Sequence, residues 1–207
     1  MRLILVRHAL PHRTDGGPGH GPADPGLTDL GHEQAERVAV ALAGVPLDGL
    51  YSSPQRRARE TAEPLARLLG RVPTPHDGLA EYDSRVGHYI PVHEMAEADP
   101  ESYRRMRDGQ LPGDIDVPVF ADRVVRALSD IGAAHPGPAT VACFAHAGTI
   151  NVFLMRLLGL DRPLAFPLDY TGITRVHLSR SGRRSVRTVN EIGHVADLLD
   201  RVGAPSG

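Results

Sequence analysis

Histidine and arginine side chains follow three apolar segments of this 207-residue chain, each at the point where the segment ends. Arg7 and His8 come directly after the first segment, Arg57 comes shortly after the second, and His146 comes shortly after the third. Imidazole is a nucleophile and a proton carrier, and the planar guanidinium fork matches the geometry of a phosphate. These residue types therefore favour chemistry on a phosphate group, provided that the fold brings them together.

Alternating strand and helix patterns position these residues. Continuous apolar runs predict buried strands, and a SerGly pair between two further strands predicts a hairpin. The predicted strands cover residues 3–6, 50–52, 139–144, 173–179 and 184–190. Such alternation is typical of an α/β fold, here a three-layer αβα sandwich with a mostly parallel central sheet and helices on both faces. Functional residues gather at the carboxyl ends of parallel strands, so the histidines and arginines should converge on one edge of the sheet.

Apolar periodicity predicts four long helices between the strands. They begin after Thr28, at Pro54, at residue 119 and at residue 148, and the second should end near Gly70. The segment 76–118 is rich in charge, proline and glycine, with short helices expected near 92–98 and 100–108. We interpret it as a helical and loop insertion over the active site, within a single domain that spans residues 1–207.

Composition limits the classes of function. Hydrophobic residues make up 41% and charged residues 23%, and the formal net charge of −2 gives no basic surface for nucleic acid. The single cysteine, Cys143, lies in an apolar run and cannot form an internal disulfide. The N-terminal apolar run is too short for a signal peptide, and no segment reaches the length of a membrane span. We expect a cytoplasmic protein that binds neither membrane nor nucleic acid.

Five segments in order resemble those of the histidine phosphatase (phosphoglycerate-mutase-like) superfamily, phosphatase branch. They are LeuValArgHisAla at 5–9, LeuThrAspLeuGlyHisGluGlnAla at 27–35, SerSerProGlnArgArgAlaArgGluThrAla at 52–62, AlaHisAlaGlyThrIle at 145–150 and AsnGluIleGlyHis at 190–194. The resemblance implies a phosphomonoester hydrolase that forms a phosphohistidine. Its substrate would be a small-molecule phosphate ester.

The residues and the resemblance together assign the main roles. His8 should attack phosphorus as a neutral imidazole and form the covalent intermediate. Arg7 and Arg57 should grip the phosphoryl oxygens, and His146 should be a further donor, protonated when substrate binds. This cationic cradle makes a metal or other cofactor unnecessary for neutralising charge.

The resemblance places the acid in a pattern like Leu-x-Glu, which here ends at Glu81, with Asp83 as the fallback. Glu81 should protonate the leaving alkoxide and then take a proton from the hydrolytic water. Adjacent helical residues point about 100° apart, so the motif register selects Arg57, while Arg56 and Arg59 should be solvated.

Two departures from the family pattern replace glycine by alanine. Ala9 follows the first histidine and Ala147 follows the second. The resemblance places Ala147 beside the phosphate, and Thr14 stands where an asparagine is usual. In the glycine-rich loop, His12, Arg13 and His20 are either surface residues or substrate contacts.

Three alternatives stay open at this stage. A phosphoglycerate mutase would share the histidine and the acid, and its activity would depend on 2,3-bisphosphoglycerate. A non-catalytic phospho-ligand binding module could keep the fold, but it has no need for a nucleophile with its acid. A metal site is a third possibility, but the 11 histidines of the sequence include no helical His-x-x-x-His pair and no Cys/His cluster. The edge strands and amphipathic helices permit a homodimer without requiring one.

Overall fold

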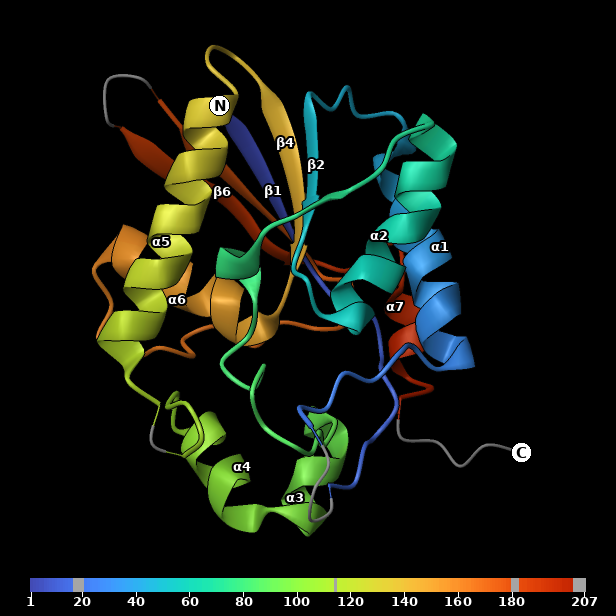
Figure 1. Ribbon diagram of the computed structural model, residues 1–207, viewed down its shortest axis with the longest axis vertical. Coiled ribbons are helices and arrows are strands. Elements are labelled where there is room, and N and C mark those ends of the chain that lie inside the picture. The colour runs from blue at the N-terminus through green and yellow to red at the C-terminus, as the bar shows by residue number, and fades with distance from the viewer. Residues whose placement is uncertain (17–20, 114, 180–182, 203–207) are drawn as a thin grey trace.

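The computed structural model describes residues 1–16, 21–113, 115–179 and 183–202, and within them a six-stranded sheet lies between two layers of helices (Figure 1). The strands are β1 (Arg2–Arg7), β2 (Gly49–Ser52), β3 (Thr74–Pro75), β4 (Thr140–Ala145), β5 (Ile173–Leu178) and β6 (Arg184–Glu191). Their order across the sheet is β3-β2-β4-β1-β5-β6. Of these strands, β5 alone runs against the others. The predicted three-layer α/β fold with a mostly parallel sheet is confirmed.

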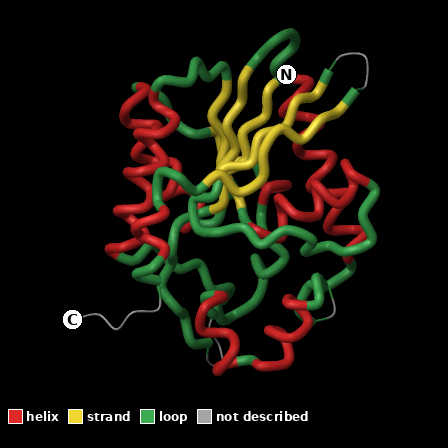
Figure 2. The backbone as a smooth tube through the Cα atoms, turned by 180° about the vertical axis from the view of Figure 1, so that it is seen from behind, coloured by secondary structure: helices red, strands yellow, loops and turns green. Residues whose placement is uncertain are grey.

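Four long helices cover the two faces of the sheet, as Figures 1 and 2 show from opposite sides. They are α1 (Asp29–Ala43), α2 (Arg56–Leu69), α5 (Val117–Ala134) and α6 (Ala147–Leu158). Because strand side chains alternate between faces, Ile4 and Val6 of β1 pack toward α1 and α2, while Leu3 and Leu5 pack toward α5 and α6. β1 is therefore buried on both faces, which fixes the position of the two residues at its end.

The segment between β3 and α5 holds only short helices. Two 3₁₀ turns cover Asp77–Leu79 and Val92–Glu94, followed by α3 (Met95–Ala98) and α4 (Pro100–Arg107). Figure 1 shows α3 and α4 apart from the sheet, beyond the carboxyl ends of β1, β2 and β4. The short helices predicted near 92–98 and 100–108 are confirmed. The last helix, α7 (Ala196–Leu199), lies beside α1 in Figure 1.

Local signals set most of the helix ends. Thr28 caps α1 by accepting a hydrogen bond from the backbone N–H of Gly31, and Gly70 ends α2 with a positive φ of 61°. The prediction that α2 opens with Pro54 is wrong by two residues. The cap is Gln55, whose backbone is extended and whose side-chain oxygen accepts a hydrogen bond from the backbone N–H of Glu81. The SerGly of the predicted hairpin turn lies outside the described residues.

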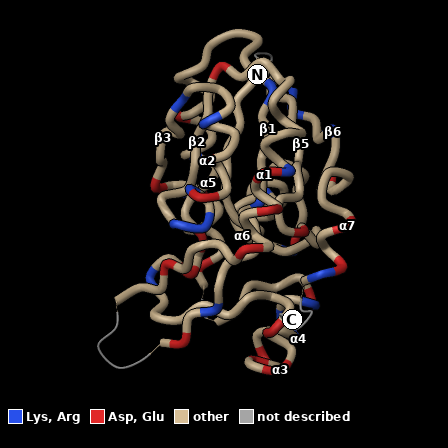
Figure 3. Tube along the Cα trace, turned by 90° about the vertical axis from the view of Figure 1, so that its right-hand side faces the viewer, with Lys and Arg blue, Asp and Glu red and all other residues tan. Residues whose placement is uncertain are grey.

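Charged residues of both signs are interspersed over the layers of the fold (Figure 3). Across the described ranges, no helix combines the length and the apolar character needed to cross a bilayer.

Candidate active site

Parallel pairing brings the two predicted histidines together. Arg7 at the end of β1 is in register with Ala145 at the end of β4, and the backbone N–H of His8 donates to the carbonyl of Ala145 at 2.8 Å. His8 and His146 therefore leave the sheet side by side, with their ring centroids 5.2 Å apart. The convergence expected from strand order is confirmed for this pair.

His8 is held as a neutral imidazole with one free nitrogen. Its Nδ1 lies 2.7 Å from the carbonyl oxygen of Ala9, and because a carbonyl only accepts, Nδ1 carries the hydrogen. The lone pair is then on Nε2, and the side chain lines the cavity at the sheet edge. Burial, and then the charges of Arg57 and Arg7, hold the pKa of His8 well below its ordinary value. The ring is consequently an unprotonated nucleophile at neutral pH.

Arg7 reaches the same cavity from the end of β1. Its Nη1 donates to the carbonyl of Leu168, and its guanidinium carbon lies 4.0 Å from the centre of the Tyr170 ring. The buried Nε of Arg7 has no partner within the protein. This arginine is thus fixed in position by the backbone and the aromatic face, while it keeps a buried donor free.

Arg57 is the most completely enclosed cation of the site, with 1% of its surface exposed. Nη2 binds both carboxylate oxygens of Asp83, at 2.8 and 3.0 Å, and the guanidinium lies 4.5 Å from the centre of the Tyr89 ring. Nε and Nη1 have no partner. Its neighbour Arg56 is instead exposed and pairs with Glu60 at 2.6 Å, which agrees with the predicted register.

His146 is fully buried, and its Nε2 lies 2.7 Å from the hydroxyl oxygen of Ser53. Nδ1 has no partner. Burial, followed by the charges of Arg57 and His8, holds the pKa of His146 well below its ordinary value. With the charges that the structure shows, this histidine is neutral at neutral pH; its protonation on substrate binding stays a prediction.

Glu81 is buried against the first turn of α6, with 6% of its surface exposed. Its Oε2 accepts from the backbone N–H of Gly148 at 2.8 Å, and its own backbone N–H donates to Gln55 at 2.7 Å. Burial, and then the negative charge of Asp83, raise the pKa of Glu81 to about 7. A carboxyl group with this pKa exchanges a proton readily at neutral pH, as a general acid and base must.

Asp83, the fallback acid, has a different place. It forms the ion pair with Arg57 and also accepts from Nε2 of Gln55 at 3.0 Å. Asp83 therefore compensates a buried cation, while Glu81 accepts from backbone N–H groups and, at 3.5 Å, from the hydroxyl of Thr149. Gln55 bonds both carboxylate segments and links them to the start of α2.

The second family motif braces the loop after His8 and does not reach the cavity. Gln34 accepts a hydrogen bond from the backbone N–H of Leu10 at 2.9 Å, and the backbone N–H of Thr28 donates to the carbonyl of Leu10 at 3.0 Å. A Cβ added to Gly31 would lie 2.1 Å from that same carbonyl oxygen. The glycine therefore allows α1 to approach the loop closely.

The remaining predicted residues fall into two groups. Ala147 lines the cavity. Thr14 does not line it; its backbone exchanges hydrogen bonds with Tyr89 at 2.9 and 2.8 Å, so that the glycine-rich loop is attached to the insertion. Arg13 forms exposed ion pairs with Asp15 and Glu94, His12 is exposed, and His20 lies outside the described residues.

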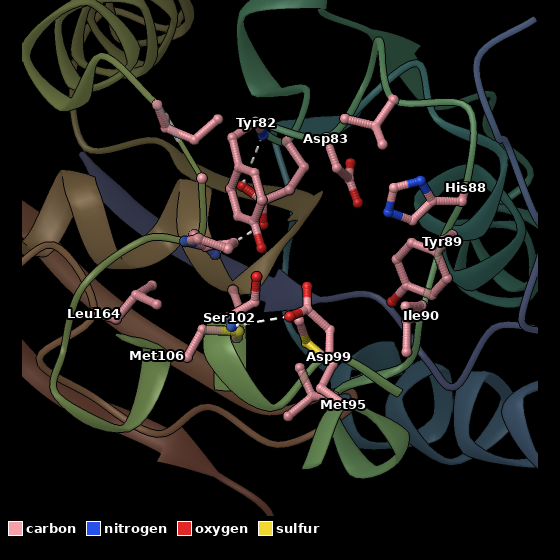
Figure 4. Close-up of a pocket in the computed structure, with 18 of the residues that line it drawn as sticks. Tyr82, Asp83, His88, Tyr89, Ile90, Met95, Asp99, Ser102, Met106 and Leu164 are labelled. Atoms are coloured by element: carbon pink, nitrogen blue, oxygen red, sulfur yellow. Dashed lines mark hydrogen bonds between the residues drawn. The ribbon is translucent and has the colours of Figure 1, made fainter. Parts of the chain in front are cut away.

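One cavity of about 420 Å³ lies at this site (Figure 4); His146 is not among the side chains that line it. Arg7, His8, Arg57 and Glu81 form one part of its wall, and the insertion supplies most of the rest. Sequence reasoning missed Gln55, Tyr89 and Tyr170, which no local pattern distinguishes from ordinary buried residues. In the described part of the chain, His, Cys, Asp and Glu side chains form no group of three or more with the geometry of a metal site.

Several known proteins are similar to this chain in sequence or in structure. A model of the histidine phosphatase superfamily (branch 1) matches residues 3–191. The putative phosphoserine phosphatase 2 of Hydrogenobacter thermophilus is 31% identical over 206 residues, which cover 95% of this chain and 98% of that protein. A bifunctional protein of Mycobacterium tuberculosis is 30% identical over 202 residues that cover 94% of this chain, which spans about half, 55%, of that relative. A mutant phosphoserine phosphatase from Entamoeba histolytica, solved in complex with phosphoserine, has a TM-score of 0.73 at 23% identity, over 94% of this chain and 98% of that one.

Proposed function

This chain belongs to the histidine phosphatase superfamily, and from that membership and the geometry of the cavity we propose that it hydrolyses phosphate monoesters through a phosphohistidine on Nε2 of His8. The observation that carries the proposal is the state of His8. Its Nδ1–H is committed to a carbonyl, its pKa is low, and it lines a cavity together with two buried guanidinium groups.

The first half-reaction follows from these positions. The phosphoryl group is bound between Arg7 and Arg57, whose unpartnered N–H groups are available to its oxygens. The Nε2 lone pair of His8 forms the N–P bond as the bond between phosphorus and the ester oxygen breaks. Glu81 gives its proton to the departing oxygen, so the alcohol leaves neutral.

The second half-reaction returns the enzyme to its starting state. Glu81, now a carboxylate, takes a proton from a water molecule that attacks phosphorus. The N–P bond breaks, inorganic phosphate is released, and His8 is again a neutral imidazole. The buried arginines supply the charge compensation that a divalent ion supplies in other phosphoryl-transfer sites.

The decisive experiment is hydrolysis of para-nitrophenyl phosphate in EDTA by the wild type and by His8→Ala. The proposal expects activity that survives the chelator and is lost in the variant. After rapid quenching, the wild type should also carry acid-labile, base-stable phosphate, the signature of phosphohistidine. Turnover by His8→Ala at the wild-type rate would refute the covalent route.

We propose in addition that residues 1–207 form a single domain with the segment 76–118 over the site, and that the protein acts in the cytoplasm. A homodimer is compatible with the exposed edges of the sheet, and sedimentation at micromolar concentration tests for one.

A further inference from the structure

The cavity changes character away from the phosphate end. Beyond Arg7 and Arg57 its wall is formed mainly by the insertion, and apolar side chains predominate there. Six of them are Val86, Ile90, Val92, Met95, Met106 and Leu164. Ile90, Met95, Met106 and Leu164 are among the side chains drawn around the cavity in Figure 4.

The charges at this end have the wrong sign for an acidic leaving group. Of the described lining residues, only Arg7 and Arg57 are arginines, and the phosphoryl group requires both. Asp83 already pairs with Arg57, and a second carboxylate, Asp99, stands among the apolar residues. His88 of the insertion also lies on this wall, and its side chain is exposed.

Two arginines on the surrounding elements are occupied by backbone carbonyls. Arg105 of α4 donates to Leu111 and Gly113, and Arg123 of α5 donates to Asp77 and Gly78. A carboxylate or a second phosphate on the leaving group would therefore be taken from water into an apolar wall whose described lining residues include no arginine besides Arg7 and Arg57, and it would lie close to Asp99.

We propose that the physiological substrate is a phosphate monoester of an uncharged, largely apolar alcohol, either aromatic or of medium chain length, without a carboxylate or second phosphate on the leaving group. The inference rests on the proposed function and deepens it. The substrate proposed for this chain differs from phosphoserine, the substrate in the names of several relatives, because phosphoserine carries a carboxylate. The cavity volume lies within the range of sites that enclose small organic ligands.

The test compares esters of primary alcohols, with para-nitrophenyl phosphate as the benchmark for the chemistry. For 2-phenylethyl phosphate we expect a kcat/KM at least about 100-fold above those for phosphoserine and 3-phosphoglycerate, because a buried, unpaired charge lowers affinity by this order. Electron-withdrawing groups make the two acids the better leaving groups, so intrinsic reactivity would produce the opposite order. Equal or greater activity on the acids overturns the inference but not the proposed function. Inactivity on every ester, para-nitrophenyl phosphate included, overturns both.

An arginine placed in the apolar wall should abolish the preference for 2-phenylethyl phosphate over 3-phosphoglycerate. In Met106→Arg we expect kcat/KM for 2-phenylethyl phosphate to fall, and that for 3-phosphoglycerate to rise, each by about tenfold or more. Glu101→Gln is the matched control, because it changes the net charge by the same amount from the exposed side of α4. Ile90→Arg repeats the test from the other part of the insertion, with a thermal melt of each variant to verify folding. An unchanged preference in folded Met106→Arg and Ile90→Arg proteins refutes the assignment of this wall to the leaving group.

Discussion

Replacing Glu81 by glutamine tests the proton transfer most directly, because the change keeps the size of the side chain and removes only its titration. General acid catalysis is worth about 10²- to 10⁴-fold when the leaving group is poor. We therefore expect Glu81→Gln to slow an alkyl phosphate by that factor. An aryl phosphate with a good leaving group should lose less than about tenfold.

The pKa of Glu81 gives a quantitative prediction for the pH dependence of the wild type. With a pKa of about 7, the carboxyl group is about nine-tenths protonated at pH 6 and about one-hundredth protonated at pH 9. The ratio of alkyl to aryl kcat/KM should then fall by about 90-fold between these two pH values. Taking the ratio removes the ionisation of any enzyme group that affects both substrates equally.

Stability provides a readout of the same group without substrate. The folded-state pKa of Glu81 is raised from 4.5 to about 7, so its contribution to stability is complete below pH 4.5 and is lost as the pH rises through 7. Relative to Glu81→Gln, the wild type should lose about 3 kcal/mol of unfolding free energy across that window, at about 1.4 kcal/mol per pH unit. Urea denaturation of both proteins at pH 4.5 and pH 8 measures this difference.

Two results would refute the reasoning about Glu81. An alkyl-to-aryl ratio that is flat from pH 6 to 9 in the wild type would show that no group of this pKa protonates the leaving oxygen. Equal slowing of both substrates in Glu81→Gln would move the acid elsewhere, first to Asp83. Either outcome would leave the nucleophilic role of His8 untouched, because that role rests on different contacts.

Three further substitutions test the positions around the acid and the phosphate. Gly148→Ala would place a Cβ 2.5 Å from Oε1 of Glu81, so we expect kcat/KM for an alkyl phosphate to fall by about tenfold or more while kcat/KM for an aryl phosphate is largely kept. Arg57→Ala should reduce kcat/KM by about 10³-fold, whereas Arg56→Ala should stay within about twofold; equal losses would contradict the assigned register. Gly31→Ala must displace backbone, so it should lower the unfolding free energy by about 1–3 kcal/mol with little change in KM, as a urea titration and initial rates would show.

The part of the site that lies on strand ends could be predicted from the sequence. An apolar run followed by Arg7 and His8 is readable as a buried strand with polar residues at its end, and the same holds for His146. Parallel pairing then determines which ends meet. Helix geometry similarly separates buried Arg57 from exposed Arg56, because adjacent side chains on a helix diverge.

The partners that adjust these groups could not be predicted in this way. The N–H that binds Glu81 belongs to Gly148, 67 positions away, and the aromatic faces under the arginines come from Tyr89 and Tyr170. No periodicity encodes such contacts, because each joins residues that are far apart in the sequence. The two-residue strand β3 and the four-residue helix α7 were not predicted, because a periodic pattern of apolar residues must repeat more than once to be recognised.

Glu81 and Asp83 lie two positions apart in the insertion, and their different neighbours give them different roles in the proposed mechanism. An ion pair with Arg57 commits a carboxylate to balancing that buried charge. Asp83 takes that position, and its negative charge then adds to burial in raising the pKa of Glu81. Gln55 binds both residues and so maintains the difference between them. The proposed acid is therefore the carboxylate that the arginine leaves unpaired, and the backbone of the insertion, not the residue type, determines which one that is.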